Sequence, residues 1–453
     1  MQHTIQREPG RARKALRYSF LDGLFSTLNM SLVDPFIVPA VLALGAGNRT
    51  VGILSGTGLL LSGLSHLFSP ALAAGASSRR TTVLRCAWAQ ALACLFLAGA
   101  GFLGAWGCVV AVAAYALYCS AGSMGFGLWA SWMSDLVPRS GRGRYFALRS
   151  MVYGPTGGAA MLGIGLLFRF LWGAGGKAPW AAFAVIFATA SALRFGSSWF
   201  LSQQHEPPAH GEKTPAEDFT YWQFLRKTGE SNFANFTVLF ALLNGGAYLT
   251  GPFFATFVLR DLQCDYFTYV MFPICAIVTS MTFVHFWARV ADRWGNMLVI
   301  RLTSMLLAFL PLLYLGNGRL WPMYIGWLLG GVAWSGLNLA TFNLVTETAT
   351  PRRRVRCYAY LQATIGIMVA IVMFVVGAVA DHLPRLFHHQ LQTVFLCSFV
   401  LRLLPALGMI FLVKERLPRP AVGMRALVAE LPAVRPAVDF LRELVRPFNR
   451  NEG

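Results

Sequence analysis

The stretch HFWARVADRWGNMLVIR, residues 285–301, decides how the rest of this chain is interpreted. It joins two long apolar segments and gathers three arginines and Asp292 around one glycine, Gly295. Soluble proteins place most of their charged residues on the surface, spread around the whole molecule. This chain instead collects them in short groups between hydrophobic runs. The nature of those runs therefore determines what the charged groups do.

The hydrophobic runs are long and numerous. Of 453 residues, 56% are hydrophobic and 13% are charged, whereas ordinary globular proteins carry roughly 25% charged residues. Apolar stretches of the ~20 residues that cross a bilayer recur from end to end. Backbone groups in lipid must be hydrogen-bonded internally, so these spans should be helices. We predict an all-α polytopic membrane protein with twelve transmembrane helices, near residues 18–44, 50–74, 82–104, 107–134, 148–172, 179–203, 232–259, 266–288, 297–316, 320–347, 356–380 and 390–413.

The net charge of +19 does not indicate a nucleic-acid partner, because of how the charge is distributed. Thirty of the 38 Lys and Arg residues lie in the N-terminal segment, in every second loop and in the C-terminal tail, and six lie in the intervening loops. That asymmetry is the positive-inside pattern. It predicts a multi-pass protein of the plasma membrane, of the bacterial inner-membrane type, with both termini in the cytoplasm. No cleavable signal peptide is evident, since the basic N-terminus precedes a run too long for one.

A polar, proline-rich linker divides the spans into two sets of six, and the order of features is similar in both sets. The matched features are Asp34-Pro35-Phe36 with Gly251-Pro252-Phe253, His66 with His285, Asp135 with Glu347, and Arg194 with Arg402. Both sets begin on the same side of the membrane, so the repeats are parallel, as in many transporters. The predicted parts are a cytoplasmic N-terminus (1–17), a six-helix bundle (18–203), a cytoplasmic linker (204–231), a second six-helix bundle (232–415) and a cytoplasmic tail (416–453), which is either an amphipathic surface helix or solvated.

Two motifs carry a resemblance to one family. Arg289-Val290-Ala291-Asp292-Arg293-Trp294-Gly295 is similar to the loop motif G-x-x-x-D-R-x-G-R/K of the major facilitator superfamily, which lies between helices eight and nine. Asp135-Leu136-Val137-Pro138, followed by Arg142-Gly143-Arg144, resembles that family's element after helix four. The N-terminal loop at residues 73–80, where the first copy of the loop motif belongs, lacks the acid. The resemblance implies the family's twelve-helix fold and secondary transport by alternating access.

Asp34 is the leading candidate for chemistry. An ionisable group inside a membrane span is expensive, so it is a functional hypothesis by default. Asp34 precedes Pro35, which interrupts the helical hydrogen bonds and frees backbone groups to bind a ligand. It either binds a proton or substrate, or it pairs with an arginine or reaches the outer interface. Arg194 and Arg402 either extend to the interface or pair structurally, and an anionic substrate is the other alternative.

The resemblance implies that spans one, four, seven and ten line a central cavity. The candidates for proton or substrate binding are Asp34, Asn29, Trp129, Trp132, Asn244, Tyr248, Trp334, Ser335 and Asn338. Few of them are charged, which favours a neutral or amphipathic solute. The alternative for each Trp and Tyr is a role in packing or at the membrane interface.

The resemblance also implies a cytoplasmic gate between the two bundles. Its predicted members are Asp292, Arg293, Gly295, Asp135, Arg142, Arg144, Arg149 and Glu347. The loop that bears Asp292 should meet the inner end of helix five, where the helix dipole favours a negative charge. Because the N-terminal loop lacks its acid, Asp292 is expected to hold this gate largely alone.

We find no clustered catalytic set, metal-binding motif or phosphate-binding loop, and the eight cysteines follow no metal or redox spacing. We therefore expect no enzyme and no cofactor. The predicted function is secondary active transport of a small neutral or amphipathic organic solute by a monomer in the lipid bilayer, with protons as a candidate coupling ion. The alternative is a non-transporting sensor or assembly factor with the same fold.

Overall fold

The computed structural model describes most of the chain, and every regular element in the described part is a helix. The described residues are 9–75, 78–137, 142–173, 178–206, 220–316, 318–348, 354–413 and 430. Residues 1–8 of the predicted N-terminus, residues 207–219 of the linker and the predicted tail apart from residue 430 lie outside this set. The limits predicted for the two bundles, the linker and the tail stay predictions.

The helices of the N-terminal half follow the predicted spans. They are α1 (Pro9–Val33), α2 (Ile37–Ala43), α3 (Asn48–Gly75), α4 (Arg79–Ala100), the 3-10 turn η2 (Gly101–Trp106), α5 (Gly107–Leu136), α6 (Arg142–Trp172) and α7 (Trp180–Ser202). The short helix α8 (Tyr221–Arg226) belongs to the linker. The C-terminal half contains α9 (Asn232–Thr256), the π turn η3 (Phe257–Asp261), α10 (Tyr266–Trp294), α11 (Asn296–Phe309), the 3-10 turn η4 (Leu310–Tyr314), α12 (Leu320–Thr348), α13 (Arg354–Val379) and α14 (Gln390–Phe411).

Within the described residues, 11 helical runs are long and apolar enough to cross a membrane. One of them, Arg79–Met133, has 55 residues, more than twice what one crossing needs. It contains α4 and α5, which reverse direction at η2, where Gly104 has a φ of 55° that favours glycine. Counted separately, these two helices bring the number of crossings to the predicted twelve.

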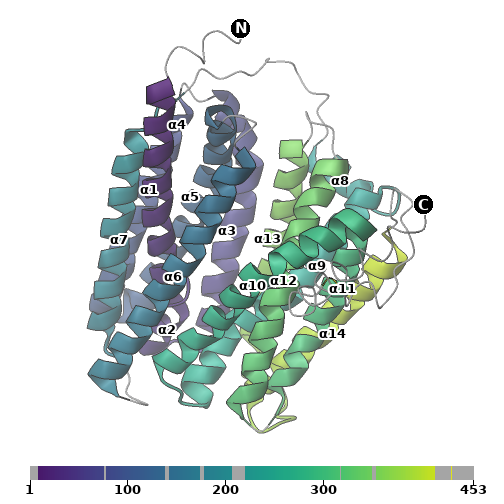
Figure 1. The fold of residues 1–453 in the computed structure, drawn as a ribbon. Helices are drawn as coiled ribbons and strands as arrows, with labels where there is room; N and C mark the ends of the chain where they lie inside the picture. Colours follow the sequence, from purple (N-terminus) through teal and green to yellow (C-terminus); the bar gives the residue numbers. More distant parts are fainter. Residues whose placement is uncertain are drawn as a thin grey trace, which may run out of the picture.

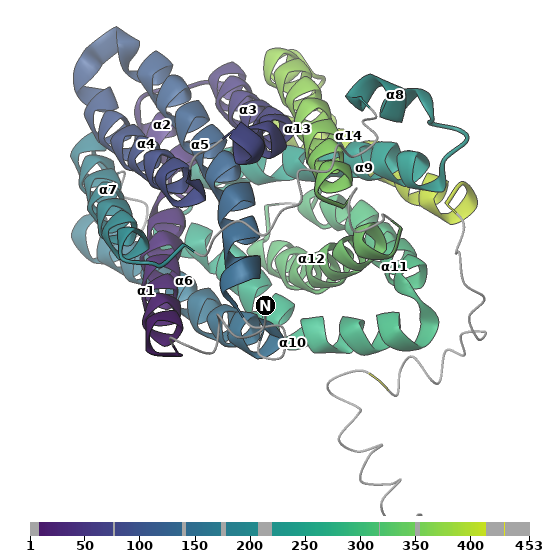
Figure 2. The same cartoon turned by 90° about the horizontal axis from the view of Figure 1, so that it is seen from above.

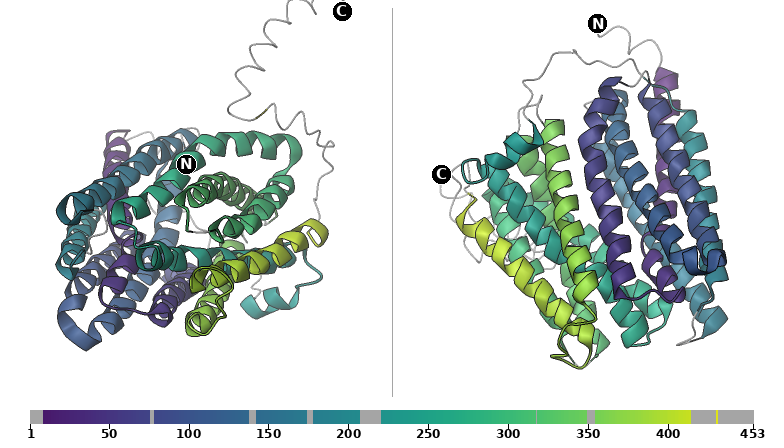
Figure 3. Two further views of the ribbon diagram at one scale, coloured as in Figure 1. Left: turned by 90° about the horizontal axis from the view of Figure 1, so that it is seen from below. Right: turned by 180° about the vertical axis from the view of Figure 1, so that it is seen from behind.

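The twelve crossings form two parallel repeats that lie side by side and diverge toward one face (Figure 1). The linker helix α8 and the beginning of α1 mark that face, which we call the linker face; the opposite face is the far face. Seen from behind, the halves meet at the far face and are apart at the linker face (Figure 3). Seen from the linker face, α1–α7 lie on one side of the molecule and α9–α14 on the other, with α3 beside α13 (Figure 2).

The first crossing is broken where the sequence places Asp34, Pro35 and Phe36. α1 ends at Val33 and α2 begins at Ile37, because Pro35 has no N–H to continue the hydrogen-bond ladder. The repeat-related Pro252 behaves differently: α9 continues through it and ends four residues later in the π turn. Of the two repeat-related prolines, only Pro35 interrupts its transmembrane helix.

The two halves come closest where α3 packs along α13, through glycines on both helices. A Cβ on Gly63 would lie 2.8 Å from the Cα of Gly366, and a Cβ on Gly52 would lie 2.7 Å from the Cα of Gly377. Small residues let helix backbones approach closely in membranes, where interhelical packing replaces the hydrophobic effect. The seam between the halves therefore rests on backbone-to-backbone contact.

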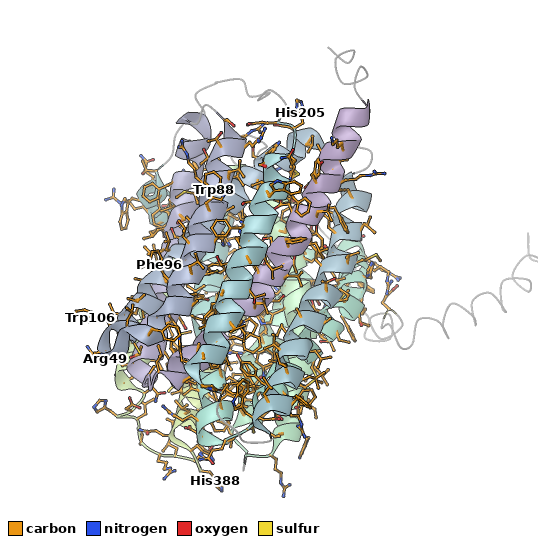
Figure 4. All side chains as sticks on the ribbon, turned by 90° about the vertical axis from the view of Figure 1, so that its left-hand side faces the viewer. Arg49, Trp88, Phe96, Trp106, His205 and His388 are labelled. Carbon is orange, nitrogen blue, oxygen red and sulfur yellow. The ribbon has the colours of Figure 1, made fainter. Side chains whose placement is uncertain are left out.

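The outer surface of the N-terminal half is apolar. Trp88, Phe96 and Trp106 point outward along one side of this half (Figure 4), and each is more than half exposed. In water such a surface would be costly, whereas lipid covers it without a penalty. The same view places His205 at the linker face and Arg49 and His388 toward the far face, at the two ends of this apolar band.

We predict that Gly63→Ala destabilises the protein by about 1–3 kcal/mol, because the new methyl group would overlap the backbone of α13. The apparent Tm in detergent should fall. Gly163→Ala is the matched control, because no atom lies within 4 Å of its Cβ position. An equal Tm for the two variants would show that the seam tolerates a wider spacing.

Candidate functional site

The far face is closed by contacts between the two halves. Arg169 at the end of α6 forms an ion pair with Asp265 at the start of α10, with 3.1 Å between Nη1 and Oδ2. Asn48 at the start of α3 donates to Asp381 beyond α13 at 2.6 Å. One hydrophobic cluster, which includes Phe36, Phe168, Phe183, Phe254, Tyr269 and Met373, contains buried residues from both halves. The far face is therefore sealed by a shared core.

The linker face lacks such a shared core among the described residues. Its two hydrophobic clusters each draw their buried residues from one half, and the second repeat's cluster receives only Leu67 from the first. Between α6 and α10, Gly165 lies against Val270 and Phe267 near the far face, and Gly154 lies against Met281 nearer the middle. α6 and α10 thus remain in contact from the far face to the middle, and the described clusters nearer the linker face are not shared in this way.

The space between the halves contains a central cavity with two lobes. The lobe in the N-terminal half has a volume of about 840 Å³ and the lobe in the C-terminal half about 660 Å³. Tyr248, Tyr358 and Gln362 line both lobes, so the two lobes adjoin each other. Cavities of this size accommodate small organic molecules.

Asp34 lines the N-terminal lobe at the break between α1 and α2. Its side chain is exposed to the cavity, and its carboxylate forms no hydrogen bond or ion pair within the described part of the chain. Next to it, the carbonyl of Pro35 accepts a hydrogen bond of 3.0 Å from the hydroxyl of Tyr269 in the other half. The predicted binding residue is thus adjacent to a contact that closes the far face.

Arg149 also lines the N-terminal lobe and is not part of a gate in this structure, contrary to the prediction. Its Nη1 donates to the carbonyl and the hydroxyl of Ser19 on α1, each at 2.9 Å. The guanidinium lies 4.7 Å from the ring centroid of Trp129 and 4.9 Å from that of Tyr153. Aromatic faces stabilise a cation in such positions. Arg149 therefore joins α1, α5 and α6 inside one half.

Arg194 points into the bundle, so it does not extend to the membrane interface. It donates from Nη1 to the hydroxyl of Ser197 at 2.7 Å and from Nε to Gln90 at 2.9 Å. Ser197 in turn donates to the carboxylate of Asp22 at 2.6 Å. The positive charge of Arg194 is thus balanced by Asp22 through one serine, an arrangement that corresponds to the structural-pairing alternative for this arginine.

The C-terminal lobe contains four of the predicted residues: Asn244, Tyr248, Trp334 and Asn338. The rings of Tyr248 and Trp334 are edge to face, 6.2 Å apart, and Asn338 is exposed to the lobe. Arg402 borders this lobe but is only 3% exposed. It donates to the carbonyls of Gly246, Ala247 and Leu307 and to the hydroxyl of Thr250.

Three predicted binding residues do not line either lobe. Asn29 is 1% exposed, and its amide group is bonded to Ala190 and Tyr118 inside the N-terminal half. Trp132 is fully buried and donates to the carbonyl of His205 at 3.1 Å. Ser335 donates to the carbonyl of Val332 in its own helix. These side chains hold the bundles together.

The loop between α10 and α11 does not reach the N-terminal half. Gly295 ends α10 with a φ of 95°, a conformation that suits glycine, and Asp292 is exposed without a hydrogen bond or ion pair in the described chain. Arg289 and Arg293 instead bind Glu430 of the C-terminal tail, at 3.2 Å and 3.4 Å. The predicted contact of Asp292 with helix five is absent here, because the halves are apart at this face.

The acid that the N-terminal loop lacks is supplied from beyond α7. Glu206 accepts hydrogen bonds from the hydroxyl of Ser78 at 2.6 Å and from the backbone N–H of Arg79 at 2.8 Å, at the start of α4. Arg79 also pairs with Asp135 at 2.7 Å. Asp135 is thus bound within its own half, and Arg79 is held by acids on both sides.

The other predicted gate residues lie at the linker ends of their helices. Glu347 accepts a hydrogen bond of 2.8 Å from Asn296, so it connects α12 to α11. Arg142 and Arg144 are in the first turn of α6. Residues 349–353, between α12 and α13, are outside the described set.

The sequence pattern of the Major Facilitator Superfamily matches residues 20–321, about two thirds of the chain. This chain belongs to the major facilitator superfamily. Solved structures of the superfamily share its fold at low sequence identity. They include a mutant of the nucleoside transporter NupG (TM-score 0.71, 14% identity, 88% of this chain and 100% of that one) and a D-xylose-proton symporter (0.68, 13%, 90% and 99%). No curated protein matches by sequence.

A third solved structure is similar in the same way. A bacterial homologue of the iron transporter ferroportin, solved in an inward-facing state, has a TM-score of 0.66 at 14% identity, over 89% of this chain and 99% of that one. At such identities the similarity establishes the fold alone. For a superfamily member, a cavity between the repeats that opens to one face is the expected place for a transported solute.

Several residues that line the cavity could not be identified from the sequence. Ser62, Tyr115, Tyr118 and Ser123 line the N-terminal lobe, and the hydroxyls of Ser62 and Ser123 are 2.5 Å apart. They lie in largely apolar segments, and the sequence does not indicate which side of the helix a serine or tyrosine there will face. Glu206 also escapes, because it lies in a polar linker far from its partners.

We predict a pH dependence from Glu206. Burial alone would raise its pKa, but the hydrogen bonds from Ser78 and from the N–H groups of Arg79 and Arg80, with the charge of Arg79, lower the pKa below its usual 4.5. A lowered pKa stabilises the folded protein above the unfolded-state pKa, and this contribution is lost as pH falls through the folded-state pKa. Glu206→Gln should therefore lower the apparent Tm by a few degrees at pH 7 and have a smaller effect below pH ~4.

Glu230→Gln is the control for that experiment, because Glu230 is an exposed acid in the chain segment before α9. It should change Tm little at either pH. A Glu206→Gln effect that is equal at both pH values would contradict the assigned role of the carboxylate charge.

Proposed function

We propose that this protein is a secondary active transporter that moves a small neutral or amphipathic organic solute by alternating access, with protons as the coupling ion. The observation that supports it most is the two-lobed cavity between the repeats, sealed at the far face by a shared core and open at the linker face. Transport requires such a site to exchange one open face for the other. We propose no catalytic activity and a monomeric state.

The orientation follows from charge. Lys and Arg concentrate in the loops at the linker face, so we assign this face to the cytoplasm of a bacterial-type plasma membrane. The described conformation would then be open to the cytoplasm. Both termini would lie on the cytoplasmic side.

Asp34 is the proposed proton carrier. It is the acid in the cavity without a hydrogen-bonding partner among the described residues, whereas Asp22 is bound to Ser197. In the cytoplasm-open state its carboxylate can exchange a proton with water in the cavity. Its position beside Pro35, whose carbonyl takes part in the far-face contact, would let a change at Asp34 alter that contact.

The test is transport by purified protein in proteoliposomes. A thermal-shift screen of metabolites and drugs selects the solute, and an imposed proton gradient should then drive its accumulation. Asp34→Asn should abolish this accumulation, while exchange of solute persists at concentrations that saturate the variant. Accumulation by the variant at the wild-type level would exclude Asp34 as the proton site. Binding without movement of any solute would instead favour a non-transporting sensor.

The gate assignments predict opposite shifts in conformation. Asp265→Asn removes the ion pair with Arg169 but keeps a good N-cap for α10. A half-exposed ion pair contributes ~0.5–1 kcal/mol, so this variant should increase the cytoplasm-closed population about two- to fivefold. Adding Asp292→Asn should reverse the shift, because we assign Asp292 to the closed cytoplasmic gate.

Spin labels at Thr81 and Thr228, exposed positions on opposite halves at the linker face, would report these populations as distance distributions. The native cysteines are first replaced by serine. An unchanged distribution in Asp265→Asn would contradict the far-face gate. A double variant that stays closed would contradict the role of Asp292.

A further inference from the structure

The charges around the N-terminal lobe leave Asp34 uncompensated. Arg194 is balanced by Asp22 through Ser197. Arg149 meets α1 at Ser19 and at Gly23, where only a glycine leaves room for its guanidinium. From Gly23 to Asp34 the distance along α1 is about 16 Å, at 1.5 Å per residue. No described basic side chain therefore contacts the carboxylate of Asp34.

The C-terminal lobe offers no carboxylate, since none of its lining residues is Asp or Glu. Its one arginine, Arg402, is almost completely buried and already donates to three carbonyls and one hydroxyl. An anion in this lobe would therefore find no exposed guanidinium to pair with. Among the charged residues that line the two lobes, the carboxylate of Asp34 is the one without a described hydrogen bond or ion pair.

Aromatic rings line both lobes. Tyr115 and Tyr118 are stacked with centroids 6.3 Å apart in the lobe of Asp34. Tyr248 lines both lobes and lies edge to face with Trp334. Aromatic faces attract cations and pack against apolar groups. A carboxylate beside aromatic walls is the combination that recognises an organic cation.

We propose that the transported solute is an amphipathic organic cation, such as a protonated amine, whose charge pairs with Asp34 and whose apolar part lies between Tyr248 and Trp334 in the C-terminal lobe. This inference rests on the proposed transport function and specifies its substrate class. The solute would touch both repeats, one through its charge and the other through its apolar part. A neutral solute of the same shape would gain no charge-assisted hydrogen bond, and an anion would be repelled by Asp34.

The experiment measures binding to the full-length protein in detergent. Three probes share a phenylethyl group and carry head groups of different charge: 2-phenylethylamine, which is protonated at pH 7, neutral 2-phenylethanol and anionic 3-phenylpropionate. Radiolabelled tetraphenylphosphonium is the reporter ligand that they displace, and tetraphenylborate of the same shape is its anionic counterpart. The two cations should bind at least tenfold more tightly than the neutral and anionic probes.

Three variants connect this preference to Asp34. Asp34→Asn should weaken cation binding about 10- to 100-fold and remove the charge preference, since hydrogen bonds to charged groups have this magnitude. Asp34→Glu keeps the charge and should retain the preference. Asp261→Asn is the control, because that acid pairs with Arg260 outside the cavity.

The outcomes separate the two proposals. Equal binding of cationic and neutral probes, or a charge preference that survives Asp34→Asn, would overturn the cation assignment. If proteoliposomes accumulate a neutral or anionic solute and bind no cation, the transport function stands and the substrate class is wrong. If cations bind at Asp34 but no solute moves, the site assignment is supported and the transport function fails.

Discussion

The backbone contact between α3 and α13 is the constraint on which the shape of the cavity depends. Gly63 and Gly366 bring the two repeats within van der Waals distance where any side chain would hold them apart. Beside this contact, His66 of α3 lies edge to face with Tyr358 of α13, with centroids 6.2 Å apart. Tyr358 is one of the residues that line both lobes. The seam thus positions the boundary between the lobes, and the helices farther from it are free to diverge.

The fold was predictable because its signals are local. Long apolar runs, the alternation of basic and neutral loops, and glycine at a turn such as Gly295 can each be read without knowledge of distant contacts. The depth of Asp34 in the membrane was predictable for the same reason. Its rotation toward the cavity was not, because hydrophobicity reports how deep a residue lies in the bilayer and says little about which side of a helix faces a water-filled space.

The candidate site shows this limit residue by residue. Trp334 faces the second lobe, but its neighbour Ser335 does not, because successive helical residues differ by about 100° in direction. Asn29 and Trp132 fail in the same way on α1 and α5. The resemblance places Arg149 with Arg144 in the gate, although the intervening part of α6, about one and a half turns, carries Arg149 into the bundle.

The position of the predicted gate loop can be compared with this structure, but its expected contact with the other repeat would form only in another conformation. The loop motif around Asp292 is correctly placed between α10 and α11, but its partner helix lies on the other repeat and is out of reach while the linker face is open. Glu206 illustrates a different limit. Its partners, Ser78 and Arg79, are more than 120 residues away, and no spacing rule connects a linker acid to the start of a helix across that interval.

The two ends of the linker are attached to different repeats. Glu206 is bound to the start of α4, while α8 lies on α13 through the hydroxyls of Tyr221 and Thr364, 3.1 Å apart. Fourteen peptide units connect Glu206 to Thr220, and fully extended they reach about 45–50 Å. This reach exceeds the ~30 Å thickness of a bilayer's hydrocarbon core. A chain of this contour length allows the repeats to rock relative to each other, so the end points of the motion are set by contacts between helices.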